Sequence, residues 1–128
     1  MSNVFPVDIE IFDAPQGHGY SELHVDAKNP FLSMGTVVHG HEFHYSKIVN
    51  EPSTIITACS VKRGVGCFGR RDFLVARNVM AGYTHLHAMA TPEWTAGLVN
   101  AARHFAIECE PRRSITIERT NVPAIQLR

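Results

Sequence analysis

The chain has 128 residues, with 12 basic and 12 acidic side chains, and therefore a formal net charge of zero at neutral pH. This length fits one domain, and a hydrophobic share of 45% is that of a folded protein rather than a disordered one. The balanced charge does not indicate binding to nucleic acid or to an anionic membrane. No apolar run reaches the roughly 20 residues that span a bilayer, and the first residues do not form a signal-peptide pattern.

Cysteine and histidine are the two informative residue types in the composition. The cysteines, Cys59, Cys67 and Cys109, are odd in number, which predicts reduced thiols and a cytoplasmic location. There are eight histidines, and because an imidazole ordinarily titrates near pH 6.5, the chain is expected to gain positive charge below about pH 6.

Short segments that alternate apolar and polar residues, separated by glycine and proline, predict strands in the first two thirds of the chain. Val7, Ile9 and Ile11 are expected on the half-buried face of the first strand, and Leu23 and Val25 share the apolar face of the second. The predicted strands are Phe5–Phe12, Tyr20–Ala27, Thr36–Tyr45, Ser53–Val61, Phe73–Ala76 and Val79–His85, with a turn at 15–19 and a glycine-rich loop at 63–69.

One helix is predicted after these strands. Thr91 suits the N-cap, Pro92 the first helical position, and Glu93 the first turn, where the helix dipole favours an acid. The helix is expected to end shortly before Pro111. Apolar residues at spacings of three and four form a stripe along it: Trp94, Leu98, Ala101, Ala102 and Phe105.

This order of elements predicts an α/β or α+β fold that is rich in strands and has one main C-terminal helix. The helices are too few for a complete doubly wound domain, in which strands and helices alternate. Residues 1–128 are expected to form a single domain, with 107–128 as its tail.

A first cluster of polar residues lies in the third predicted strand. Alternation places His39 and His41 on one face, and Glu42 and His44 on the other. Two imidazoles two residues apart can bind a metal, so His39 and His41 form an alternative metal site of the cupin type. Tyr45 stands where that motif needs a glutamate, so we predict no metal site. The competing interpretation is that these histidines form structural hydrogen bonds.

A second cluster follows the last predicted strand. His85 lies at the carboxyl end of that strand, where catalytic groups of open α/β sheets gather. His87 would point the same way if the strand continued. One histidine could then act as a general base, with the other fixing its tautomer. The alternative is a pair of structural histidines at a strand end.

Three stretches carry a resemblance to a known family. Residues 15–20 (Pro-Gln-Gly-His-Gly-Tyr), 39–46 (His-Gly-His-Glu-Phe-His-Tyr-Ser) and 78–87 (Asn-Val-Met-Ala-Gly-Tyr-Thr-His-Leu-His) occur in one order and at one spacing. Over about residues 4–106 the chain resembles the C-terminal part of cobyrinic acid a,c-diamide synthases of cobalamin biosynthesis. Thr-His-Leu-His-Ala at 84–88, followed by Pro-Glu-Trp, is similar to the branch associated with dissimilatory sulfite reductase, thought to amidate siroheme.

The resemblance implies a partial flavodoxin-like domain of a class I glutamine amidotransferase. In that family, a cysteine activated by a histidine releases ammonia from glutamine. A P-loop domain then uses ATP and Mg to activate a tetrapyrrole carboxylate, which the ammonia converts to an amide. By position, His85 corresponds to the catalytic histidine. Glu42, His44 and His87 are expected to support the site.

The chain also departs from the family pattern. It has no P-loop motif, and it lacks the elbow cysteine, which in the family lies well upstream of the motif at 39–46. Cys67 does not fit such an elbow, because it has Gly69 two residues after it but Val65 where a glycine is required before it. We therefore expect no activity of the chain alone, no cofactor bound by it, and tetrapyrrole and glutamine as ligands of the whole enzyme. A domain that ends its sheet early exposes an edge and an apolar face, so a homo-oligomer or a complementary chain is expected. The alternative is a non-enzymatic module that binds siroheme, another tetrapyrrole or a metal.

Overall fold

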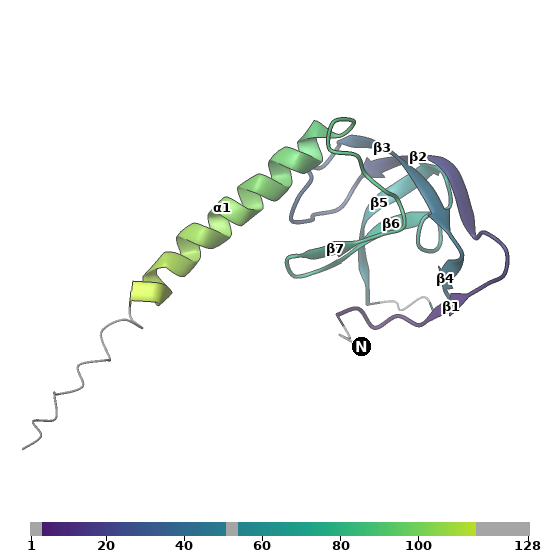
Figure 1. Cartoon of the computed structure of the whole chain (residues 1–128), viewed down its shortest axis with the longest axis horizontal. Helices are drawn as coiled ribbons and strands as arrows, with labels where there is room; N and C mark the ends of the chain where they lie inside the picture. The colour runs from purple at the N-terminus through teal and green to yellow at the C-terminus, as the bar shows by residue number, and fades with distance from the viewer. Residues whose placement is uncertain (1–3, 51–53, 115–128) are drawn as a thin grey trace, which may run out of the picture.

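The computed structural model describes residues 4–50 and 54–114, and their side chains as far as residue 108. Seven strands precede one long helix (Figure 1). In chain order the elements are β1 (Ile9–Ile11), β2 (Gly17–Val25), β3 (Val37–His44), β4 (Ser46–Ile48), β5 (Ile56–Arg63), β6 (Arg71–Ala76), β7 (Val79–Ala81) and α1 (Pro92–Ser114).

Five of the strands form a curled sheet in the order β3-β2-β5-β6-β7, and β1 pairs with β4 beside it. Every pairing between described strands is antiparallel. The predicted class is confirmed, since the chain is strand-rich with one main helix. The antiparallel pairing corresponds to α+β, the second of the two forms that the sequence left open.

The core lies on the inner side of the curled sheet. Leu23 and Val25 of β2 point inward, as their alternation predicts, and both are buried. Val38 enters from β3 and Phe73 from β6. The remaining residues of this main cluster are Leu32, Ala58, Cys59 and Val61. A second, smaller cluster around Ile48, Cys67 and Leu74 fills the space between β4, β6 and the N-terminal segment.

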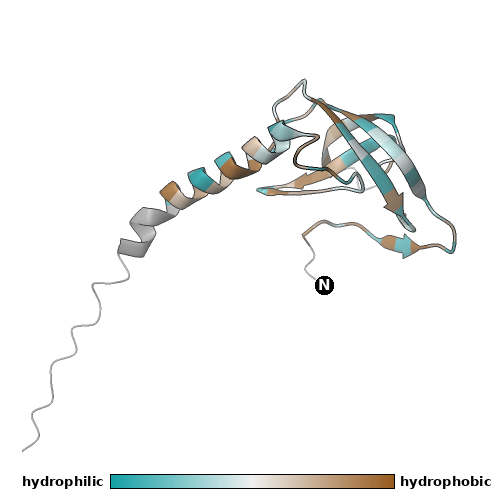
Figure 2. Ribbon diagram, turned by 45° about the horizontal axis from the view of Figure 1, so that its top comes forward, coloured by the Kyte–Doolittle hydropathy of each residue, from teal (hydrophilic) through white to brown (hydrophobic). Residues whose placement is uncertain are grey.

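The helix begins where the sequence predicts. Thr91 is buried, its carbonyl accepts the backbone N–H of Trp94 at 3.1 Å, and Pro92 opens α1. The predicted end before Pro111 is wrong, since α1 continues to Ser114. After its first turns the helix extends away from the sheet (Figure 1), so Phe105 on the apolar stripe is 62% exposed. Figure 2 shows the hydrophobic positions along it.

Three further expectations need correction. Ile9 and Ile11 are exposed, because β1 pairs with the short β4 and no second layer of described residues covers it. The turn predicted at 15–19 ends early, since β2 begins at Gly17. The strand predicted to reach His85 stops at Ala81.

Some predictions fall outside the described residues. Ser53, expected to open the fourth strand, is among them, as are residues 115–128 of the predicted tail. No helix in the described ranges is long and apolar enough to cross a membrane.

Candidate functional site

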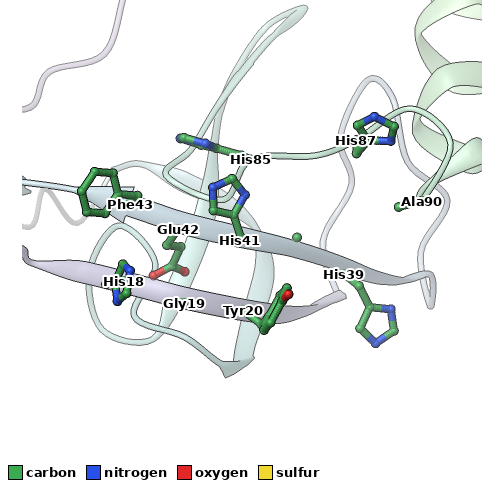
Figure 3. Close-up of a pocket in the computed structure, with 11 residues that line it drawn as sticks. His18, Gly19, Tyr20, His39, His41, Glu42, Phe43, His85, His87 and Ala90 are labelled. Atoms are coloured by element: carbon green, nitrogen blue, oxygen red, sulfur yellow. The ribbon is translucent and has the colours of Figure 1, made fainter.

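The outer face of β2 and β3 carries a groove rich in histidine (Figure 3). The alternation of β3 places His39 and His41 on one face and Glu42 and His44 on the other, as the sequence predicted. The first face is exposed and also carries Phe43, and the second is buried. The cavity of about 790 Å³ is called the histidine groove here; it is lined by His18, Gly19, Tyr20, His39, Gly40, His41, Glu42, Phe43, His85, His87 and Ala90.

His85 reaches this groove by pairing with β3. Its backbone N–H donates to the His41 carbonyl at 2.8 Å, and the His41 N–H donates to the His85 carbonyl at 3.3 Å. The two rings lie edge to face, with centroids 4.8 Å apart at 83° (Figure 3). Gly40 allows this approach, because a Cβ there would collide with the His85 carbonyl oxygen and lie 2.6 Å from Cγ2 of Thr84.

Glu42 lies beneath the groove with 1% of its surface exposed. Its carboxylate accepts the backbone N–H of Val65 at 3.0 Å, that of Gly66 at 3.1 Å, and the Thr84 hydroxyl at 3.3 Å. Backbone N–H groups aimed at a buried carboxylate compensate its loss of water. Glu42 therefore connects β3 to the glycine-rich loop and to the segment that carries His85.

His44 occupies the buried side of β3 and lies outside the histidine groove. Its Nδ1 donates to the Ser46 carbonyl at 2.8 Å, and its ring stacks on Tyr83 with centroids 3.8 Å apart at 11°. Its Nε2 has no hydrogen-bond partner among the described residues and lies 3.8 Å from Oε2 of Glu42. Burial raises the pKa of the Tyr83 hydroxyl, which shares a 2.9 Å hydrogen bond with the Ser46 hydroxyl.

His87 lies at the other end of the groove, beside Ala90 and the start of α1 (Figure 3). It would share a strand face with His85 only if the strand continued, and the chain leaves the sheet after the bridge at His85. Its Nδ1 accepts the backbone N–H of Met89 at 3.3 Å. His39 approaches Glu22 at 3.5 Å on the outer face, but the part of the chain with described positions contains no group of three side chains arranged to hold a metal.

Two cysteines can be judged as nucleophiles, and both are buried. Burial raises the pKa of Cys59 to about 12. Burial and the carboxylate of Asp72 also raise the pKa of Cys67, whose thiol donates to Oδ1 of Asp72 at 2.9 Å. Because a thiolate is the reactive form, neither side chain is suited to attack an amide.

Comparison with known proteins identifies relatives of the chain. It is 38% identical over 103 residues to the cobyrinate a,c-diamide synthase of Methanosphaera stadtmanae, a match that covers 80% of this chain and 23% of that protein. The chain is also 32% identical to the synthase of Methanobrevibacter smithii, over 78% of this chain and 23% of that protein. It is 33% identical to the synthase of Magnetococcus marinus, over 73% of this chain and 20% of that protein. The chain is related to the cobyrinate a,c-diamide synthases.

The match spans less than a quarter of the length of these synthases. No known family profile matches the chain, and no solved structure is significantly similar to it.

Within this synthase-related segment, two buried residues were not found by sequence reasoning. Asp72, with 0% exposure, accepts the backbone N–H groups of Phe73 at 2.8 Å, Tyr83 at 3.2 Å and Thr84 at 3.0 Å. Thr84 is 5% exposed and contacts both Asp72 and Glu42. In the sequence, nothing distinguishes a buried acidic residue at the start of an apolar strand, such as Asp72, from an exposed acidic residue. Tyr20 and His18 of the groove were named within the motif at residues 15–20, without a role in the site.

Proposed function

We propose that this chain forms the part of a glutamine-dependent tetrapyrrole amide synthase that supplies the general base of the glutaminase reaction. The names of its relatives support amidation of a corrin precursor such as cobyrinate. Thr-His-Leu-His-Ala at 84–88 favours siroheme as the substrate of this particular branch. The ATP, Mg and carboxylate-activating step of such an enzyme belong to parts of the protein beyond this segment.

The observation that carries the proposal is the placement of His85. Its side chain is exposed at the histidine groove, while its backbone is bonded to His41. A general base needs this combination of a fixed backbone and a ring open to a second reactant.

In the proposed reaction, a ring nitrogen of His85 accepts the proton of a cysteine thiol that lies outside this segment. The sulfur forms a bond to the glutamine amide carbon, and the C–N bond breaks. His85 returns the proton to the departing nitrogen, which leaves as ammonia. Water then hydrolyses the thioester to glutamate and restores the thiol. Cys67 does not replace this cysteine, because it is buried and its pKa is raised.

A chimera tests the assignment of His85. In the Methanosphaera stadtmanae synthase, the matched segment is replaced by this chain, and ammonia release from glutamine is measured. We expect His85→Ala to reduce the rate at least a hundredfold, the typical contribution of a general base. The matched control is His104→Ala, an exposed histidine on α1. Ammonia release at the unsubstituted rate by the His85→Ala chimera contradicts the proposal.

A second candidate function is ligand binding without catalysis. Five histidines line the groove, His18, His39, His41, His85 and His87, and imidazole is a common axial ligand of tetrapyrrole iron. Titration of the isolated chain with siroheme or heme, followed by visible absorbance, tests this function. A spectrum unchanged at micromolar protein removes it.

A further inference from the structure

Thr84, the residue directly before His85, is held at two points. Its backbone N–H donates to Oδ2 of Asp72 at 3.0 Å, and its hydroxyl donates to Oε1 of Glu42 at 3.3 Å. All three residues are at most 5% exposed. Two buried carboxylates from different strands therefore meet at one threonine beside the groove.

The position of Asp72 depends on an irregularity in β6. Residues Cys59 and Asp72 pair, and Thr57 and Leu74 pair, while Phe73 between them has a φ of 59°. This left-handed conformation is unfavourable for a residue with a Cβ, and it persists only where surrounding contacts fix it. Oδ1 of Asp72 accepts the backbone N–H of Phe73 itself, so the irregular backbone and the inward carboxylate stabilise each other.

Glu42 is fixed from a second direction by the glycine-rich loop. Gly64 and Gly66 have φ values of 107° and 75°, which glycine adopts without strain. A Cβ on Gly64 would lie 2.7 Å from Oε1 of Glu42. The loop therefore closes over the carboxylate and aims two backbone N–H groups at it, which leaves Oε1 in reach of Thr84.

We propose that Glu42 and Asp72 are positioning residues for His85 and act through Thr84. β7 ends at Ala81. Apart from the bridge between His41 and His85, no strand pairing among the described residues holds the segment that follows it. A catalytic group must be held within about 0.5 Å of its working geometry, and its supporting contacts supply that precision. The catalytic meaning of this positioning rests on the proposed function, but the positioning itself is measurable without activity.

Amide hydrogen exchange of the full chain measures the positioning directly. Thr84→Val removes the hydroxyl with little change of shape, and Thr84→Ser retains it. We expect Thr84→Val to accelerate exchange at residues 84 and 85 about tenfold, the effect of one lost buried hydrogen bond, and to leave Ala58 in β5 unchanged. Thr84→Ser should exchange like the parent chain.

Thr95→Val is the matched control, because the Thr95 hydroxyl donates to the Ala88 carbonyl at 3.2 Å near the start of α1. It should not alter exchange at residues 84 and 85. Unchanged exchange in Thr84→Val overturns the proposal, and so does an equal acceleration at Ala58, which would indicate a general loss of stability.

Kinetics of the chimera separate this proposal from the proposed function. We expect Thr84→Val to lower kcat for glutamine hydrolysis about tenfold at an unchanged KM, and Thr84→Ser to restore it. If His85→Ala abolishes activity while Thr84→Val leaves kcat unchanged, the positioning proposal is wrong. If exchange changes locally but His85→Ala retains activity, the positioning stands and the proposed function is wrong.

Discussion

The imidazole rings of His41 and His85 contact each other edge to face at the outer surface of the sheet, with centroids 4.8 Å apart. Their backbones exchange two hydrogen bonds, so the contact is part of the fold rather than a chance approach of two exposed side chains.

The first prediction concerns the glycine that permits this pair. Gly40→Ala places a methyl group against the His85 carbonyl and Cγ2 of Thr84. We expect the free energy of unfolding to fall by about 1–3 kcal/mol, as in other overpacked sites, and the nuclear Overhauser contacts between the His41 and His85 rings to disappear. Val37→Ala, at an exposed position on the same strand, is the control. A Gly40→Ala chain with parental stability and intact ring contacts would contradict the close approach of the His85 carbonyl to Gly40.

The sequence predicted those features that depend on local alternation. The placement of His41 and Glu42 on opposite faces of β3 follows from a period of two along the strand. The start of α1 follows from Thr91 and Pro92, whose local preferences act within one turn.

The remaining features depend on contacts between distant segments. The carboxylates of Asp72 and Glu42 meet at Thr84 only because β6, β3 and the segment after β7 converge. An alternating strand also does not reveal what covers it, so Ile11 was expected to be half-buried and is 81% exposed. The stripe on α1 was visible, but the direction in which the helix leaves the sheet was not.

Thiol reactivity gives a second prediction. In a chain carrying Cys109→Ser, Cys59 and Cys67 remain, and both pKa values lie well above the ordinary value of 9.0. We expect Ellman's reagent at pH 7.5 to react at least a hundredfold more slowly than with free cysteine, because few thiolates form, and rapidly once guanidinium unfolds the chain. Labelling of folded Cys67 at the rate of a free thiol would argue against its hydrogen bond to Asp72.

Because of the same pKa shifts, we expect the free energy of unfolding to decrease at alkaline pH. The folded state disfavours the thiolate, so the unfolded chain releases its protons first as pH rises above about 9, and the free energy of unfolding falls from there towards pH 12. Cys59→Ala should reduce this decline without abolishing it, since Cys67 still contributes. Urea unfolding at pH 7 and pH 10 measures the difference, and an equally steep decline in the variant would contradict it.

At acid pH, the decrease in the free energy of unfolding should depend on Asp26. Arg71 donates to its two carboxylate oxygens at 2.6 and 2.7 Å, and these hydrogen bonds hold the pKa of Asp26 below its ordinary value of 3.8. The ion pair therefore stabilises the fold above that value and is lost as pH falls through the lowered pKa. Because the pair is partly exposed, we expect Asp26→Asn to cost no more than about 1 kcal/mol at pH 7, and the difference from the parent to be smaller at pH 2.5, below the ordinary pKa of 3.8.

Urea unfolding at these two pH values checks the prediction. Asp13→Asn, an exposed acid near β1, is the control and should show no such pH-dependent difference. An Asp26→Asn effect of equal size at pH 7 and pH 2.5 would mean that the residue acts through packing rather than charge.

The last prediction concerns the apolar side of α1. Leu98 and Phe105 are 42% and 62% exposed, and with Pro30 and Phe31 they line a hollow beside the helix. Exposed apolar surface of this kind favours association, and we expect the chain to sediment at micromolar concentration as a particle heavier than its 14.2 kDa. Replacing Leu98 and Phe105 by serine should reduce the sedimenting mass and change the free energy of unfolding by less than about 0.5 kcal/mol, because neither side chain is buried.

Arg103→Ser, an exposed substitution on the same helix, separates loss of apolar surface from a general effect on α1. It should leave the sedimenting mass unchanged, because it removes a charge but no apolar contact. A parent chain that remains at 14.2 kDa at every concentration would exclude self-association through this helix.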